Sequence, residues 1–93
     1  MSAAIQEKVI MLVDEVYRTM VGDALDVTLK PSTDIQKDLG FDSIVVVVLL
    51  IKLEDFFHIR FDALSTDLGT VFTTIQSISE YIGQHMEQMN DEL

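Results

Sequence analysis

Ser43 offers chemistry that no other residue of this chain matches, because its hydroxyl stands where a polar loop meets a long apolar segment. The surrounding residues are Asp38-Leu39-Gly40-Phe41-Asp42-Ser43-Ile44. A helix that begins at this junction leaves the serine exposed beside unpaired backbone N–H groups. Because the positive end of a helix dipole favours negative charge, the position suits a hydroxyl that carries a phosphate group.

Other polar groupings predict no second site. Asp34, Asp38 and Asp42 recur every four residues, but this is not the spacing of a calcium-binding loop, and no bidentate glutamate follows. His58 and His85 have no neighbours at metal-ligand spacing, which is typical of surface histidines. We therefore expect no metal site.

Glu54 and Asp55 are the remaining candidates for acid–base chemistry, as a pair of neighbouring carboxylates. Adjacent residues of a helix point in different directions, and the sequence indicates no pocket around them. The chain is therefore predicted to have no catalytic centre and not to be an enzyme.

The elements that must position Ser43 are predicted to be helical. Apolar residues recur at gaps of three and four, which indicates an amphipathic helix from Ile5 to Met20. Val21–Lys37 is predicted to be a long loop, with a turn at its single proline and with Leu29 and Ile35 as anchors in the core.

The segment from Ile44 to Phe57 fits two structures. Its run Ile-Val-Val-Val-Val-Leu-Leu-Ile is continuous and rich in β-branched residues, which by propensity suits a buried strand. Asp42 and Ser43 favour a helix start, and the charged continuation from Lys52 suits a helix better. No other segment offers a convincing partner strand, so we predict a helix.

The remainder of the chain predicts a short helical turn around Asp67–Phe72 and a last helix. Thr73 and Gln76 have the spacing of a capping box, with Thr73 as the cap. The expected buried stripe is Ile75, Ile78, Ile82, Met86 and Met89. The fold class is therefore all-α, a small four-helix bundle of three longer helices and one short helix with a long first loop, and residues 1–93 are expected to form a single domain.

Composition narrows the classes of function. The net charge is −10, with 16 acidic residues against six Lys and Arg, which argues against nucleic-acid binding and is compatible with basic protein partners. There is no cysteine, hence no disulfide and no thiolate nucleophile. The longest apolar run is too short to span a membrane, and the first residues lack a signal-peptide core. We expect a monomeric cytoplasmic protein.

Three groups of residues together carry a family resemblance. They are the stretch Asp38–Ile44, the following Leu53-Glu54-Asp55-Phe56-Phe57, and Thr73-Thr74-Ile75-Gln76 with Tyr81-Ile82 in the last predicted helix. In these motifs the chain resembles the acyl carrier and peptidyl carrier protein family. The resemblance extends from the first helix to about His85, and it implies an acyl-carrier-like helical bundle.

The resemblance also implies a cofactor, partners and site residues. A phosphopantetheinyl transferase would attach 4′-phosphopantetheine from coenzyme A to Ser43 as a phosphodiester. The thiol of this arm would hold an acyl or aminoacyl group as a thioester, between a loading enzyme and downstream synthase or tailoring enzymes. Asp42, the motif neighbour, would cap the helix or help to orient the transferase and its metal, and the cap is the simpler role. Gly40 would permit a tight turn.

The second predicted helix has more apolar residues than one buried face needs. If Lys52 and Asp55 mark its solvent side, helical steps place Ile44, Val45, Val48 and Ile51 on that side. The opposite side supplies enough core residues: Val46, Leu49, Leu50, Leu53 and Phe57. The exposed set is predicted to dock partner enzymes, unless the connector from Ala63 to Gly69 covers part of it.

Several functions stay open. In fatty-acid carriers the corresponding face is typically acidic, so an apolar face favours a free-standing carrier for a polyketide, nonribosomal-peptide or specialised acyl pathway. The alternatives are a carrier of housekeeping fatty-acid synthesis and an unmodified helical module for protein interaction. Attachment of phosphopantetheine separates the carrier functions from the last of these.

Overall fold

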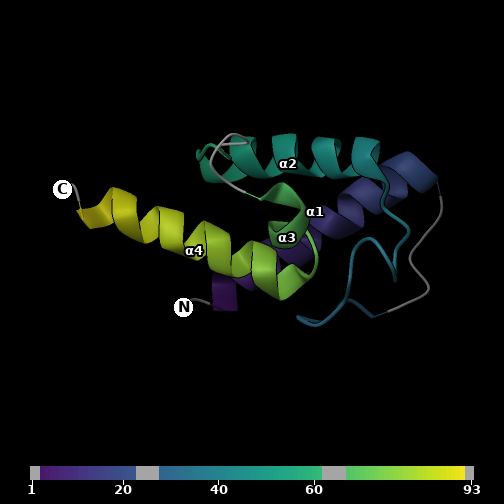
Figure 1. The fold of residues 1–93 in the computed structure, drawn as a ribbon, viewed down its shortest axis with the longest axis horizontal. Helices are drawn as coiled ribbons and strands as arrows, with labels where there is room; N and C mark the ends of the chain where they lie inside the picture. Colours follow the sequence, from purple (N-terminus) through teal and green to yellow (C-terminus); the bar gives the residue numbers. More distant parts are fainter. Residues whose placement is uncertain (1–2, 23–27, 62–66, 92–93) are drawn as a thin grey trace.

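The computed structural model describes residues 3–22, 28–61 and 67–91, which form four α-helices. In chain order these are α1 (Ala3–Val21), α2 (Ser43–Phe57), α3 (Leu68–Val71) and α4 (Ile75–Asp91). α1 packs against both α2 and α4, and α3 packs on α4. Figure 1 shows α1 behind the other two long helices, with the short α3 between α2 and α4. The predicted all-α bundle of three longer helices and one short helix is confirmed.

α1 is amphipathic, as its spacing predicts, and it extends slightly beyond the predicted range of Ile5–Met20. Its buried face consists of Val9, Leu12, Val13 and Val16. The helix ends where Gly22 takes a φ of 88°, a left-handed conformation that glycine adopts readily. The N–H of Gly22 donates a hydrogen bond to the carbonyl of Arg18 at 3.0 Å and closes the last turn.

The loop between α1 and α2 is fastened to the start of α4. The N–H of Ile35 donates to the carbonyl of Thr73 at 2.9 Å, and the N–H of Ile75 donates to the carbonyl of Thr33 at 3.2 Å. Ile35 is fully buried and Leu29 packs against the core, so both predicted anchors are confirmed. Part of the predicted loop, residues 23–27, lies outside the described residues.

The β-branched run of α2 forms a helix rather than a strand. Asp42 starts the helix, since its backbone is extended and its side chain accepts a hydrogen bond from the N–H of Val45 at 3.0 Å. Leu49 and Leu53 are fully buried and hold the helix on the core. Capping and tertiary burial therefore outweigh the strand propensity of the valines.

α3 is the short turn predicted around Asp67–Phe72. Asp67 caps it, because its carboxylate accepts hydrogen bonds from the N–H of Thr70 at 3.3 Å and from the Thr70 hydroxyl at 2.9 Å. Phe72, directly after α3, is fully buried and packs against Phe61, with 5.2 Å between ring centroids. This aromatic contact fixes the end of α3 to the core.

α4 is capped one residue later than the sequence predicts. Thr74 Oγ1 accepts a hydrogen bond from the N–H of Ser77 at 3.0 Å, and Ser77 Oγ accepts one from the N–H of Thr74 at 3.1 Å. The predicted box of Thr73 with Gln76 is wrong, because the Thr73 hydroxyl donates to the Gly69 carbonyl at 2.9 Å instead.

The buried stripe of α4 follows the prediction as far as its side chains are described. Ile75, Ile78 and Ile82 are fully buried, and Met86 packs against the core. The side chain of Met89 lies outside the described part of the structure. Ser79, buried on the same helix, donates its hydroxyl to the Ile75 carbonyl at 2.7 Å, so its polarity is satisfied within the helix.

Candidate functional site

Ser43 is the first residue of α2, and it is exposed as the sequence predicts. Its hydroxyl has no hydrogen-bond partner among the described residues. The first N–H groups of α2 lie next to it, at the positive end of the helix dipole. A phosphate attached to this oxygen would therefore lie in a favourable electrostatic environment, and nothing in the described structure would have to move to admit it.

Asp42 has the capping role that the sequence favours. Its carboxylate accepts from the N–H of Val45 at 3.0 Å, and its backbone carbonyl accepts from the N–H of Val46 at 2.9 Å. These two bonds hold the first turn of α2 and so determine the direction in which Ser43 faces. The alternative role of Asp42, orienting a transferase and its metal, stays a prediction.

The residues just before Asp42 anchor this end of the helix to the core. Gly40 has a φ of 73°, in the left-handed region that favours glycine, and its N–H donates to the carbonyl of Gln36 at 3.1 Å. Phe41 is buried and stacks on Tyr17 of α1, with 6.4 Å between ring centroids. The chain is therefore fixed to the core two residues before the exposed serine.

A hollow of about 350 Å³ opens beside Ser43, and we call it the serine hollow. It is lined by Gln36, Phe41, Asp42, Ser43, Val46, Val47, Leu68 and Gly69. The start of α2 forms one wall and α3 contributes another. Since most of the lining is apolar, the hollow suits an apolar group better than a charged one. The sequence does not reveal this feature, because its two walls come from separate helices.

The outward side of α2 differs from the prediction. Ile44, Val47 and Ile51 are exposed by 67%, 51% and 56%, and we call these three residues the outer row. Val45 and Val48 were predicted to be exposed together with Ile44 and Ile51, and this is wrong, since both are half-buried and pack against the core. Val47 takes their place.

The position of Lys52 explains the error. Its ammonium group pairs with the Glu15 carboxylate of α1 at 3.3 Å, so Lys52 lies on the flank that faces α1 rather than at the outermost line of α2. Val48, one turn earlier, lies on the same flank. Spacing alone does not choose between the two valines, because Val47, three residues after Ile44 and four before Ile51, fits a helical line as well as Val48 does.

The other expectations for α2 agree with the structure. Leu49 and Leu53 are fully buried, and Val46, Leu50 and Phe57 pack against the core. Most of the connector from Ala63 to Gly69, which was considered as a cover for the outward side, lies outside the described residues.

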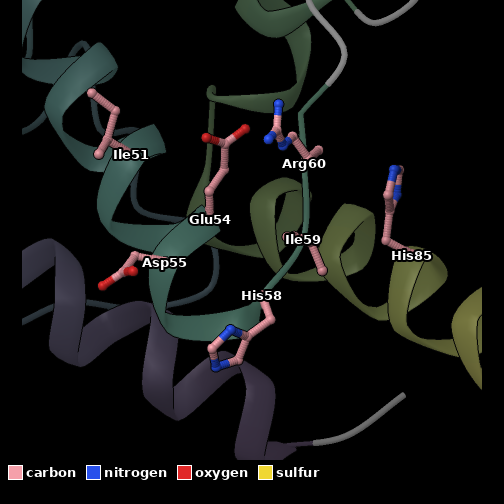
Figure 2. A pocket seen from close by; sticks show the side chains of 7 residues that line it. All are labelled: Ile51, Glu54, Asp55, His58, Ile59, Arg60 and His85. Carbon is pink, nitrogen blue, oxygen red and sulfur yellow. The ribbon is translucent and has the colours of Figure 1, made fainter.

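A larger cleft of about 650 Å³ lies at the far end of the outer row, and we call it the α2 cleft. Its lining consists of Ile51, Glu54, Asp55, His58, Ile59, Arg60 and His85. Figure 2 shows Glu54 and Asp55 on α2, Ile59 and Arg60 on the segment that follows, and His85 across from them on α4. His85 stacks on Tyr81, with 4.3 Å between ring centroids, and the Glu54 carboxylate accepts from the N–H of Phe61 at 2.8 Å.

The acidic residues near Ser43 have structural partners. Asp34 accepts hydrogen bonds from the N–H groups of Gln36 and Lys37, and Asp38 accepts one from the N–H of Asp34 at 2.9 Å. Within the described ranges, no three His, Cys, Asp or Glu side chains group in a way that could hold a metal ion. None of the helices in those ranges is long and apolar enough to cross a membrane.

Comparison with known proteins shows the family of the chain. The family described as "phosphopantetheine attachment site" matches residues 17–82, a segment that includes Ser43 and all of α2. The chain belongs to this family. This phosphopantetheine carrier therefore has a covalently attached 4′-phosphopantetheine as its cofactor. The exposed hydroxyl at a helix N-terminus fits that group, because a phosphodiester needs both a free oxygen and a positive electrostatic environment.

Two relatives place the carrier among acyl carrier proteins. It is 39% identical over 59 residues to the acyl carrier protein of Phytoplasma mali (strain AT), a match that covers 63% of this chain and 67% of the relative. It is 41% identical over 54 residues to the acyl carrier protein of Trieres chinensis, covering 58% of this chain and 64% of the relative. The matched segments therefore span about two thirds of the relatives' own lengths.

Proposed function

We propose that this chain is an acyl carrier protein whose phosphopantetheine arm is attached at Ser43. The observation that carries the proposal is the exposed Ser43 hydroxyl at the N-terminus of α2, which has no hydrogen-bond partner among the described residues and lies within the segment that matches the family. When bound, the arm supplies a thiol on a flexible tether, which holds an acyl or aminoacyl group as a thioester and moves it between enzymes.

In the attachment step this chain supplies the accepting oxygen of Ser43. A new bond forms between Ser43 Oγ and the phosphorus next to the pantetheine of coenzyme A, while the pyrophosphate bond breaks, adenosine 3′,5′-bisphosphate leaves, and the serine proton passes to the transferase or to water. The Asp42 carboxylate accepts from the N–H of Val45 as a helix cap, and we assign acceptance of the serine proton to the transferase or to water. α2 then stabilises the attached phosphate through its N-terminal N–H groups.

The serine hollow supports an apolar cargo. It adjoins Ser43, and its walls include Phe41, Val46 and Leu68. An acyl chain or part of the arm that folds back into this hollow would lose contact with water, which is favourable for apolar groups. The carrier would in this way shield its cargo between encounters with enzymes.

The pathway we favour is polyketide, nonribosomal-peptide or specialised acyl synthesis, with housekeeping fatty-acid synthesis as the alternative. The apolar outer row supports this choice, since acidic docking faces are typical of fatty-acid carriers. We further propose a non-catalytic, monomeric, cytoplasmic single-domain carrier. Its partners would be a phosphopantetheinyl transferase, a loading enzyme and downstream synthase or tailoring enzymes. The mass of the acylated protein isolated from its native cell would identify the cargo and decide between the pathways.

The attachment site is tested by intact-mass measurement. We expect the purified protein, incubated with coenzyme A and a phosphopantetheinyl transferase of broad specificity, to gain the mass of one phosphopantetheine. Ser43→Ala should abolish the gain because the accepting oxygen is removed. Ser32→Ala, which removes another exposed serine hydroxyl, should leave it intact. An unchanged wild-type mass, or a gain that persists in Ser43→Ala, would show that the proposal is wrong.

A further inference from the structure

Gln36 brings a polar side chain to the lining of the serine hollow. Most of the other side chains in that lining are apolar, namely Phe41, Val46, Val47 and Leu68. The remaining polar residues, Asp42 and Ser43, belong to the attachment site, and Asp42 caps α2. Gln36 lies in the loop before α2, so neither capping nor attachment accounts for its place in this wall.

The hydrogen-bonding capacity of the Gln36 amide is only partly used by the chain. Its nitrogen Nε2 donates to the backbone carbonyl of Phe72 at 3.0 Å, across 36 positions of sequence. Because only the nitrogen can donate to a carbonyl, this bond fixes which end of the amide is which. The oxygen Oε1 has two lone pairs, and none of the described residues donates a hydrogen bond to it. The side chain can therefore accept a hydrogen bond from a molecule in the hollow.

The Gln36 amide is held in place from both of its ends. Phe72, whose carbonyl holds the amide nitrogen, is fully buried directly after α3. On the backbone side, the N–H of Gln36 donates to the Asp34 carboxylate at 2.9 Å, and the N–H of the preceding Ile35 donates to the carbonyl of Thr73. A side chain that is already fixed loses little further freedom when it binds a donor. The oxygen is therefore a pre-organised acceptor.

The size of the hollow restricts which part of a cargo can reach this oxygen. A volume of about 350 Å³ lies near the lower limit for small-molecule pockets, so only a short segment fits. A cargo shields its thioester only when the carbons next to the thioester are the segment that enters. An unsubstituted alkyl segment there would remove water from Oε1 without replacing the hydrogen bond, which is unfavourable. A segment that carries a hydroxyl would replace it.

We propose that Gln36 is a specificity-determining residue through which the carrier shields 3-hydroxyacyl cargo in preference to unsubstituted acyl cargo. The Gln36 oxygen accepts a hydrogen bond from the cargo hydroxyl, while Phe41, Val46 and Leu68 contact its alkyl part. The inference rests on the proposed function, because the cargo reaches the hollow on an arm attached at Ser43. It deepens that function by naming the chemical class of the cargo.

The test compares the protection of two thioesters that differ by one hydroxyl. A broad-specificity transferase loads the apo carrier from octanoyl-coenzyme A or from 3-hydroxyoctanoyl-coenzyme A, and intact mass then follows cleavage of each thioester by hydroxylamine. Each rate is divided by that of the same coenzyme A thioester, which removes the intrinsic effect of the hydroxyl on reactivity. We expect the wild-type carrier to protect the hydroxylated cargo about threefold more, a ratio typical of one partly exposed hydrogen bond.

Two variants of Gln36 separate recognition of the cargo from support of the fold. Gln36→Met has a side chain of similar length without an acceptor oxygen, whereas Gln36→Lys loses the acceptor but keeps a donor for the Phe72 carbonyl. Both variants should lower the threefold preference to about one. Gln84→Met, at another exposed glutamine on α4, is the matched control and should keep the preference. Circular dichroism checks that each variant is folded.

The outcomes separate this inference from the proposed function. No mass gain with either coenzyme A thioester contradicts the proposed function itself. Normal loading with equal protection of the two cargoes overturns only the inference, as does a preference that persists in Gln36→Met, since another group would then be the acceptor. A preference that is lost in Gln36→Met but kept in Gln36→Lys also overturns it, because Gln36 would then act only through its bond to Phe72.

Discussion

Among the residues that the structure describes, His58 has the backbone conformation that least suits its side chain. It ends α2 with φ 56° and ψ 47°, a left-handed conformation, and its N–H donates to the carbonyl of Glu54. Helices commonly use glycine at this kind of position because a Cβ is unfavourable there. The strain is local, and it lies at the edge of the α2 cleft, about two turns beyond Ile51, the end of the outer row farthest from Ser43.

We predict that His58→Gly stabilises the fold by roughly 0.5–1 kcal/mol, because relief of the left-handed strain exceeds the extra chain entropy that glycine has when unfolded. The measurement is urea denaturation followed by circular dichroism. Gln84→Gly, at an exposed interior position of α4, is the control in which glycine should destabilise a helix. Its free energy of unfolding should fall by about 1 kcal/mol. Equal losses in both variants would show that His58 makes a stabilising contact that outweighs the strain.

At the scale of elements, the first loop and α4 support each other. The backbone bonds that join Ile35 to Thr73 and Ile75 to Thr33 tie the loop that leads to Ser43 to the first turn of α4. The N–H of Gln76 also donates to the carbonyl of Pro31 at 2.8 Å. Fraying of the start of α4 would therefore loosen the loop that positions Ser43, although the two are distant in sequence.

The cap of α4 gives a prediction at this scale. Thr74→Ala should lower stability by about 1 kcal/mol, since it leaves the N–H of Ser77 without its capping oxygen. Thr73→Ala should cost less than half as much, because the Thr73 hydroxyl only supplements a carbonyl of α3. Thermal unfolding of the two variants side by side checks this. A larger loss of stability for Thr73→Ala than for Thr74→Ala would show that Thr73 caps α4, as the sequence predicts.

At the scale of the whole molecule, negative charge dominates. Among the described residues the ion pairs are Asp14 with Arg18 and Glu15 with Lys52, and all four side chains are partly or largely exposed. Exposed pairs of this kind contribute little to stability. Repulsion among the many carboxylates should therefore exceed the attraction within the ion pairs. Charge repulsion then destabilises the folded state at low ionic strength.

We predict that sodium chloride stabilises the protein at pH 7. Raising its concentration from about 20 mM to about 0.5 M shortens the Debye length severalfold and screens the repulsion. The Tm should then rise by about 4–8 °C, the shift that corresponds to roughly 1 kcal/mol in a domain of this size. Chloride is used rather than sulfate, since sulfate also strengthens apolar burial. A Tm that falls as salt is added would mean that the ion pairs dominate.

The sequence by itself determined the helices and the place of the exposed serine at the start of α2. Apolar spacing in α1 and α4 and the Asp42–Ser43 junction are local signals, and local hydrogen bonding and side-chain period suffice to produce the elements they predict. The loop anchors Leu29 and Ile35 could likewise be identified, because an isolated apolar residue in a polar loop is most stable when it is buried against the core.

Tertiary structure decided which line of α2 faces water and what lies beside Ser43. A helix in which eight consecutive apolar residues follow the first residue can be rotated about its axis without a change in the sequence pattern. Only the packing against α1, where Lys52 pairs with Glu15, shows that Val47 is outermost and Val48 is not. The serine hollow and the α2 cleft depend in the same way on contacts between segments far apart in the chain. Periodicity assigns a residue to a face, but only the neighbouring helix determines whether that face is covered.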